Sequence, residues 1–239
     1  MLPVFATQIL AHWELNKKQR ENCIMADNIK AVIFDMDGVL QDSETISDIT
    51  WDMAAKEWGI ENNFDVLQSC RGCNRHDIEL KLKAFYGEAF DSHAFLERTS
   101  QLFHEIENTK GIPLMHYAKE ILEYLKPNYK LALASSTRGE SVRRQMKAGG
   151  LIDFFESLTT GDMVKHSKPE PEIYLKAAES IGIKPENCVA VEDSPNGVKS
   201  AYAAGMRVIM VPDKIQPDEE LKKLCWKICN SLEEVKALL

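Results

Sequence analysis

Several features that place a sequence in a special class of protein are missing here. No apolar run reaches the roughly 18 to 20 residues of a membrane-spanning helix, so we expect no membrane partner. The 29 basic residues are outnumbered by 37 acidic ones, and the net charge of -8 gives no general attraction to nucleic acid or to an anionic membrane. Internal repeats and low-complexity segments are also absent. Any phosphorylated ligand must therefore bind through a local group of residues.

Cysteine shows no pattern of a disulfide framework. The chain is too long to need disulfide bonds for stability, so we expect reduced thiols and a cytoplasmic location. Cys70-x-x-Cys73 has a spacing known from zinc and redox sites, but the other close pair, Cys225 and Cys229, lies far away in the sequence. We therefore interpret the cysteines as small buried or half-buried side chains.

The length of the chain suggests more than one compact unit. At 239 residues, with 44% hydrophobic and 28% charged residues, it is typical of a globular protein with one large domain and one smaller, inserted domain. We expect an N-terminal extension over residues 1–29, a core formed by 30–42 and 111–239, and a cap over 43–110.

Short apolar runs alternate with amphipathic stretches in most of the chain, and this alternation predicts an α/β fold with a doubly wound, mostly parallel, Rossmann-like sheet. The first strand begins at Ala31. The other expected strands cover 129–134, 157–160, 188–191, 206–211 and 226–229. The expected core helices cover 113–126, 138–147, 171–182, 194–205 and 232–239.

The segment between the first and second strands has a different pattern. Apolar residues recur at helical spacing over 43–59, 76–86 and 92–108, with no convincing strand between them. We therefore expect a small α-helical cap domain inserted directly after the first strand.

Two carboxylates follow that strand. Side chains two apart on an extended chain point the same way, so Asp35 and Asp37 should face one crevice while Met36 turns into the core. Two like charges this close repel each other, and a hard cation such as Mg²⁺ stabilises both. Gly38 allows a sharp turn afterwards.

Other chemically active residues also follow strands. Ser135 follows the second strand, Glu192 and Asp193 follow the fourth, and Lys168 precedes a proline in the loop between the third and the fourth. Taken singly, an aspartate after a strand is commonly a turn or cap residue, a serine an N-cap, and a lysine a solvated surface residue. Because the carboxyl ends of parallel strands lie together, the joint pattern favours a reaction centre instead.

Four motifs, in their order along the chain, resemble those of the haloacid dehalogenase superfamily of phosphotransferases. They are Asp35-Met36-Asp37-Gly38-Val39, Ser135, Lys168-Pro169 and Glu192-Asp193-Ser194. The helical insert is similar to that of its branch with β-phosphoglucomutase and sugar-phosphate phosphatases. The resemblance covers about residues 30–239 and implies the same Rossmann-like core.

The resemblance also implies roles for individual residues. Asp35 would be the nucleophile that forms an aspartyl phosphate, and Asp37 the acid and base. The metal Mg²⁺ would be held by the Asp35 carboxylate, the Asp37 backbone carbonyl and Asp193, with Glu192 beside them. The phosphoryl oxygens would be bound by Ser135, the backbone N–H of Ser136, and Lys168. A dehalogenase would need neither the second acid nor the metal.

The choice between hydrolysis and transfer depends on the cap. The stretch Arg71-Gly72-Cys73-Asn74-Arg75 resembles the cap segment of β-phosphoglucomutases, which makes Arg75, with Gly72 and Asn74, the candidate substrate contact; the alternative is a surface arginine. Ser47 stands where those mutases carry a histidine. We therefore expect a Mg²⁺-dependent phosphatase of a small phosphorylated metabolite, a sugar phosphate by preference, with β-phosphoglucomutase as the alternative.

A third hypothesis is a magnesium-binding regulatory module without catalysis. It is less favoured because every charged group that the chemistry requires is present. For either enzyme we expect a small phosphorylated metabolite as partner, no nucleic acid, a role in carbohydrate metabolism, and a monomer or dimer.

Overall fold

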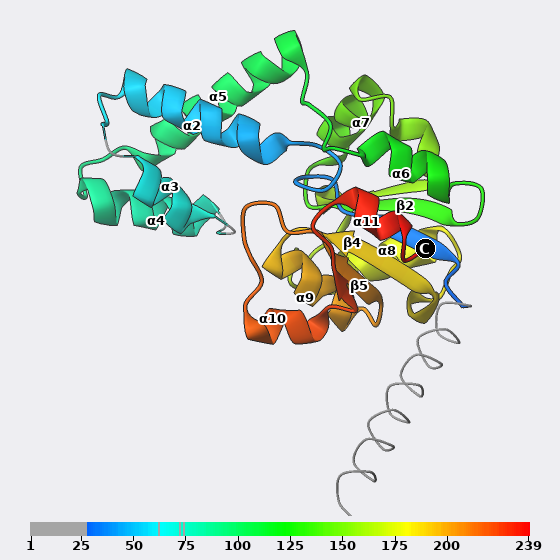
Figure 1. Ribbon diagram of the computed structural model, residues 1–239. Coiled ribbons are helices and arrows are strands. Elements are labelled where there is room, and N and C mark those ends of the chain that lie inside the picture. The colour runs from blue at the N-terminus through cyan, green and yellow to red at the C-terminus, as the bar shows by residue number, and fades with distance from the viewer. Residues whose placement is uncertain (1–27, 62, 72, 74) are drawn as a thin grey trace, which may run out of the picture.

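Six parallel strands form the centre of the protein. The computed structural model describes residues 28–61, 63–71, 73 and 75–239 (Figure 1). The strand order across the sheet is β3-β2-β1-β4-β5-β6, and every pair of neighbours is parallel. The strands are β1 (Ala31–Phe34), β2 (Lys130–Ser135), β3 (Ser157–Thr160), β4 (Cys188–Glu192), β5 (Arg207–Met210) and β6 (Lys227–Ile228).

The helices divide into those that follow β1 directly and those that connect later strands. The first group is α2 (Ser43–Glu57), α3 (Phe64–Cys70), α4 (Arg75–Tyr86) and α5 (Ser92–Lys110). The second group is α6 (Ala118–Leu125), α7 (Gly139–Ala148), α8 (Glu172–Ser180), α9 (Pro195–Ala203), α10 (Glu219–Leu224) and α11 (Leu232–Lys236).

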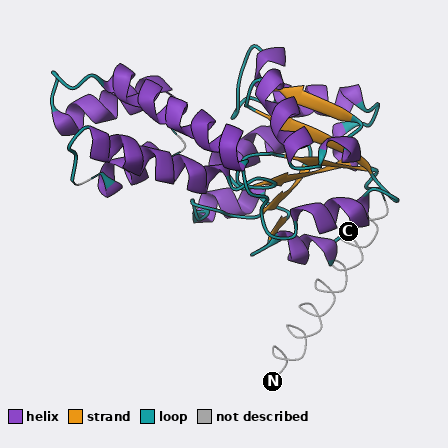
Figure 2. Ribbon diagram, turned by 90° about the horizontal axis from the view of Figure 1, so that it is seen from above, coloured by secondary structure: helices purple, strands orange, loops and turns teal. Residues whose placement is uncertain are grey.

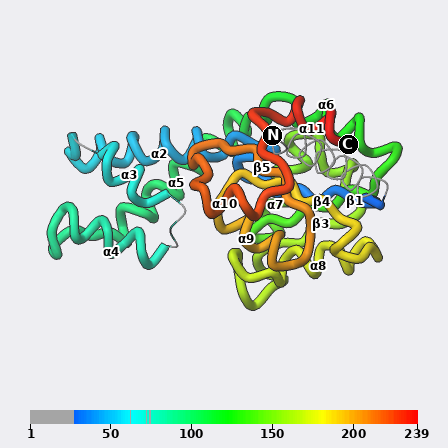
Figure 3. Tube along the Cα trace, turned by 60° about the horizontal axis from the view of Figure 1, so that its bottom comes forward, coloured from blue at the N-terminus to red at the C-terminus, as the bar shows by residue number. Residues whose placement is uncertain are grey.

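The strands β1, β2, β4 and β5 are buried on both faces, so alternate side chains enter two separate cores. Val32 and Phe34 point to the face covered by α6, α7 and α11, and Ala31 and Ile33 to the face covered by α8, α9 and α10. Figures 2 and 3 show the sheet between these two layers of helices. The expected doubly wound α/β fold is confirmed.

The helices α2 to α5, called the cap helices from here on, extend away from the sheet (Figure 1). They have a hydrophobic core of their own, in which Trp51 meets Phe95 edge to face with ring centroids 5.0 Å apart. Leu82 and Leu102 of α4 and α5 complete this core. The apolar periodicity of the segment therefore buries its residues against one another rather than against the sheet.

Two short linkers, residues 38–42 and 111–117, connect the cap helices to the sheet. They pair side by side, because the N–H of Asp42 donates to the Pro113 carbonyl at 2.9 Å and the N–H of Met115 donates to the Leu40 carbonyl at 3.0 Å. The chain therefore enters and leaves the cap helices at one place.

Most expected elements are present, with three differences. The helix expected over 113–126 begins only at Ala118, because Leu114 forms a bridge with Gln41 and Tyr117 has a positive φ of 68°. The helices α3 and α10 were not expected; both are short, at 7 and 6 residues, and carry little periodicity. Only Asn28 and Ile29 of the expected extension over 1–29 lie within the described residues, and Ile29 packs into the core.

Two expectations drawn from composition can be compared with the structure. Within the described residues, none of the helices combines the length and the apolar character needed to cross a bilayer. The five cysteines among those residues are free thiols: Cys70, Cys73, Cys188, Cys225 and Cys229. Cys23 lies outside the described part of the chain.

Candidate active site

The site lies at the carboxyl end of β1, beside its neighbours β2 and β4. The N–H of Asp35 donates to the Val191 carbonyl at 3.0 Å, which extends the pairing of β1 with β4 by one residue. Asp35 is thereby fixed at the carboxyl end of these two strands. The residue is only 7% exposed. The chain order reverses at β1, and open α/β sheets bind their ligands at such a point.

The turn after Asp37 brings the chain close to the end of β4. Gly38 has a φ of 75°, and a Cβ there would lie 2.4 Å from Oδ2 of Asp193. Only glycine fits both the backbone conformation and this contact. The turn therefore places the first motif directly against the acidic end of β4.

Glu192 is completely buried, and both of its carboxylate oxygens accept hydrogen bonds. Tyr174 and Lys168 each donate to Oε1 at 2.6 Å. The N–H and the hydroxyl of Ser194 donate to Oε2 at 3.4 and 3.2 Å. A Cβ at Gly197 would lie 1.9 Å from the Glu192 carboxyl, so a side chain there would displace it. Glu192 is thus held in a single position.

Lys168 links the two carboxylate motifs from the loop before α8. Its Nζ donates to Oδ1 of Asp35 at 2.6 Å, to Oε1 of Glu192 at 2.6 Å and to the Ala134 carbonyl at 3.1 Å. Burial alone would lower the pKa of Lys168, but the negative charges of Asp35 and Glu192 outweigh this and raise it. The ammonium group is therefore charged at neutral pH.

Three carboxylates converge at this point. Ligand oxygens of Asp35, Glu192 and Asp193 lie within 4.8 Å of one another. Burial raises the pKa of Asp35 to about 7, in spite of the opposing charge of Lys168, and raises the pKa of Asp193 well above its usual value. One ammonium group cannot neutralise three carboxylates, and hard oxygen donors suit a divalent cation such as Mg²⁺. The residues present therefore fit a metal ion.

Asp37 is oriented by β2 rather than by the acidic cluster. Thr137 donates its hydroxyl to Oδ2 of Asp37 at 3.0 Å, and Ser135 donates to the same atom at 3.5 Å. The hydroxyl oxygen of Ser135 also accepts the N–H of Thr137 at 3.1 Å. Ser136, the other candidate of this loop, is exposed. Thr137 was missed from the sequence; its hydroxyl, two residues after Ser135, was the available signal.

The cluster of carboxylates consists of the side chains of Asp35, Glu192 and Asp193. Asp37 was expected among the metal ligands through its backbone carbonyl and does not join this cluster through its side chain. Glu192, expected beside the metal, also holds Lys168 and the start of α9. Lys168, expected to bind phosphoryl oxygens, donates to Asp35, Glu192 and a backbone carbonyl in this structure.

Two arginines of the cap stretch occupy different environments. Arg75 is half exposed and pairs with Glu79 at 3.3 Å and Glu97 at 2.7 Å, both on cap helices. The side chain of Arg71 is only 10% exposed and pairs with Asp48 at 2.8 Å and Glu44 at 3.3 Å. Gly72 and Asn74, the two other candidates of this stretch, lie outside the described residues.

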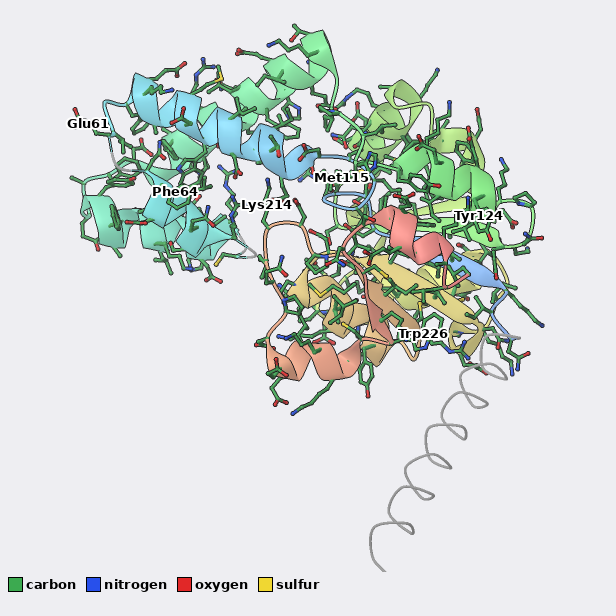
Figure 4. All side chains as sticks on the ribbon, in the orientation of Figure 1. Glu61, Phe64, Met115, Tyr124, Lys214 and Trp226 are labelled. Atoms are coloured by element: carbon green, nitrogen blue, oxygen red, sulfur yellow. The ribbon has the colours of Figure 1, made fainter. Side chains whose placement is uncertain are left out.

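Arg71 also lines two pockets, one between the cap helices and the core and the other within the cap itself. The smaller, about 80 Å³, lies between Glu44, Arg71, Asp193 and Lys214. The larger, about 220 Å³, is lined only by residues between Glu44 and Ile78, Ser47 among them. Lys214, labelled in Figure 4, lies on the loop after β5 that extends toward the cap helices and donates to Thr45 of α2 at 3.2 Å. The acidic cluster therefore borders a space whose opposite wall is the cap.

The comparisons with known proteins agree with this geometry. The family described as haloacid dehalogenase-like hydrolase matches residues 32–211. A phosphorylated carbohydrates phosphatase of Thermotoga maritima is 34% identical over 216 residues, which cover 88% of this chain and 90% of that protein. Hexitol phosphatase A of Escherichia coli is 33% identical over 183 residues, which cover 76% of this chain and 82% of that protein.

A crystal structure from Thermotoga maritima, described provisionally as a β-phosphoglucomutase, has a TM-score of 0.74 at 28% identity and covers 88% of this chain and 98% of that one. The resemblance recognised from the motifs is thus confirmed, and so is the expected class of enzyme, a phosphohydrolase. The family match extends from β1 to the end of β5 and so includes every strand end described above. The chain belongs to the haloacid dehalogenase-like hydrolases.

Proposed function

We propose that the protein is a Mg²⁺-dependent phosphatase that removes phosphate from a small phosphorylated sugar through a phosphoryl group carried on Asp35. The observation that supports this most directly is the cluster of Asp35, Glu192 and Asp193, with Lys168 between two of its carboxylates. Two relatives are named as a phosphatase of phosphorylated carbohydrates and a hexitol phosphatase, and these names favour a sugar phosphate as the substrate.

The attack begins at Asp35. Lys168 holds Oδ1, so we assign Oδ2 as the atom that forms the bond to phosphorus while the bond to the leaving sugar oxygen breaks. The repulsion between a carboxylate and a phosphate dianion opposes this step, and the buried charge of Lys168 offsets part of it. A bound divalent cation would supply the remaining positive charge opposite the phosphoryl oxygens.

Asp37 is the proposed acid and base. Its Oδ2 is fixed by Thr137 and Ser135, so Oδ1 is the atom assigned to protonate the leaving oxygen. After the sugar leaves, the same atom accepts a proton from the water that attacks phosphorus, the bond between phosphorus and Asp35 breaks, and inorganic phosphate leaves with the Asp35 carboxylate restored. Ser135 and Ser136 would bind phosphoryl oxygens once substrate is present.

Substrate selection is proposed for the cap. We propose that residues 43–110 form a cap domain that closes over the core and excludes bulk water during the reaction. Arg71, which borders the same small pocket as Asp193, is the arginine placed to contact the sugar end of a substrate. Arg75 stays a candidate only if closure frees it from Glu79 and Glu97.

β-Phosphoglucomutase is the alternative, and the solved structure from Thermotoga maritima is the observation that favours it. A mutase must keep water away from the phosphorylated aspartate. Ser47, which lines the pocket within the cap, stands where mutases of this branch carry a histidine, and the lack of that histidine favours hydrolysis.

Phosphate release from a panel of hexose, pentose and hexitol monophosphates would test the proposal. We expect release that depends on Mg²⁺, is lost in Asp35→Asn and persists in the control Asp65→Asn on the exposed side of α3. Conversion of β-glucose 1-phosphate to glucose 6-phosphate with little release would establish the mutase instead. Turnover of none of these compounds would favour a regulatory module that binds magnesium without catalysis.

A further inference from the structure

The core contributes a lysine to the small pocket between the cap helices and the acidic cluster. Lys214 lies on the loop over residues 211–218, which connects β5 to α10, and it lines this pocket together with Asp193 of the cluster. In Figure 4 this loop extends toward the cap helices. No step of the proposed chemistry uses Lys214.

The Lys214 side chain connects the core to the first two turns of α2. Its Nζ donates to the Thr45 hydroxyl at 3.2 Å and lies 3.8 Å from Oδ2 of Asp48. Only 27% of the Lys214 side chain and 29% of the Asp48 side chain are exposed. Water and salt therefore screen this ion pair less than a pair on the open surface.

Asp48 also binds Arg71, the arginine proposed to contact the sugar. Nη2 of Arg71 donates to both carboxylate oxygens of Asp48, at 2.8 and 2.9 Å, and Nη1 donates to Oε2 of Glu44 at 3.3 Å. Glu44 and Asp48 are one helical turn apart on α2, so their like charges repel each other. Lys214 supplies a second cation from the core, and two cations thus balance these two carboxylates.

We propose that Lys214 is a positioning residue: it docks α2 on the core and neutralises part of the charge of Asp48, so that Arg71 exchanges Asp48 for the sugar end of the substrate. This inference rests on the proposed function, in which Arg71 contacts that end. Without Lys214, the full charge of both carboxylates acts on Arg71 and holds it more firmly. The start of α2 also loses its contact with the loop after β5, and the cap is then aligned less accurately over Asp193.

Steady-state kinetics should show a change in KM rather than in kcat. Lys214→Met should raise KM for the preferred sugar phosphate about fivefold, because the substrate competes with both carboxylates for Arg71, while kcat stays within about twofold. Lys214→Arg keeps the positive charge and should bring KM back to within about twofold of the wild type. Lys222→Met, at a lysine of α10 that is 46% exposed, is the matched control and should behave as the wild type does.

A double-mutant cycle separates positioning through Asp48 from direct contact with the substrate. When Lys214→Met is added to Asp48→Asn, KM should change by less than about twofold, because the charge that Lys214 neutralises is already absent. Three results would overturn the proposal: a KM for Lys214→Met equal to that for Lys222→Met, a KM for Lys214→Arg as high as that for Lys214→Met, or a rise of about fivefold that persists in the Asp48→Asn background.

Hydrogen–deuterium exchange of the metal-free protein tests the docking of α2 without turnover. The amides of residues 43–49 should exchange at least about twofold faster in Lys214→Met than in Lys222→Met, because α2 has lost a contact with the core. Turnover of none of the compounds in the panel would contradict the proposed function, and the part of the inference that concerns substrate would fail with it. Exchange would still decide the docking, and equal exchange in the two variants would overturn it.

Discussion

The ion pairs of the core and those of the cap have similar lengths but different surroundings. Lys168 lies 2.6 Å from Asp35 and Glu192, and all three side chains are at most 9% exposed. Arg75 lies 2.7 Å from Glu97, but these side chains are 47% and 49% exposed. Exposed pairs are screened by water and contribute about 0 to 1 kcal/mol, whereas removing one partner of a buried pair costs about 3 to 5 kcal/mol. The core site is thus fixed in position, while an exposed cap charge such as Arg75 is free to exchange partners.

The largest effect should come from Lys168→Met, because it leaves two buried carboxylates without their cation. We expect the free energy of unfolding to fall by about 3 to 5 kcal/mol at neutral pH and phosphate release to be lost. Chemical denaturation and a phosphate assay measure the two effects. Lys176→Met, at a lysine of α8 that is 41% exposed, is the control. A Lys168→Met protein as stable as that control would contradict the contrast between core and cap.

A single methyl group should test how tightly Glu192 is held. Gly197→Ala places a Cβ 1.9 Å from the Glu192 carboxyl, and overpacking of this kind costs about 1 to 3 kcal/mol. Because the displaced carboxylate no longer aligns Lys168, phosphate release should fall as well. Lys199→Ala on the exposed side of the same helix should leave both quantities near wild type. Normal stability and turnover in the Gly197→Ala protein would show that the end of β4 is adaptable.

Stability should depend on pH and Mg²⁺ together. Since burial raises the pKa of Asp35 in the folded state to about 7, from 3.8, the folded protein binds more protons than the unfolded chain between these values. The metal-free protein should therefore lose stability as the pH rises from about 4 to about 7. Mg²⁺ competes with these protons, so it should raise Tm more at about pH 8 than at about pH 5.5. Differential scanning fluorimetry measures this rise in Tm. If the rise caused by Mg²⁺ is the same at both pH values, the metal binds away from Asp35.

Arg71→Ala should act on substrate binding rather than on chemistry. We expect KM for the preferred sugar phosphate to rise by roughly tenfold with kcat within about twofold, because the guanidinium contacts a part of the substrate that does not react. Steady-state kinetics at saturating Mg²⁺ separate the two constants. A fall in kcat alone would mean that Arg71 instead aligns the acidic cluster through Glu44 or Asp48.

The smallest effect is expected for Arg75→Ala. Its two ion pairs are solvent-exposed, so the free energy of unfolding should change by less than about 1 kcal/mol and KM for a monophosphate by less than about twofold. The informative substrate is a sugar bisphosphate. If KM for the bisphosphate rises more in Arg75→Ala than in Arg71→Ala, Arg75 is again the candidate contact for a distal phosphate.

Periodicity and order of motifs were sufficient to predict the core of this protein. Buried strands such as Cys188–Glu192 are continuous apolar runs, and the polar residues that follow them lie at one edge of any parallel sheet. The positions of Asp35, Lys168, Glu192 and Asp193 could therefore be placed near one another before their distances were known.

Details that depend on three-dimensional contact could not be predicted. Whether Lys168 meets carboxylates or a ligand depends on distances that the sequence does not contain. The role of Thr137 depends on the rotamer of Asp37. In the cap, Arg71 and Arg75 are four residues apart in a similar polar context, and only packing shows that one is enclosed and the other exposed.

The pairing of the two linkers has a consequence for how such a protein can diversify. The backbone atoms of Asp42 and Pro113 meet at 2.9 Å, although the residues are far apart in the sequence. Because the two ends of the insert meet, a change of length between them does not by itself require a change in the register of β1 with β2 or β4. If the insert selects the substrate, as proposed, recombination could replace it whole, and new substrates would be acquired while the reaction chemistry is inherited.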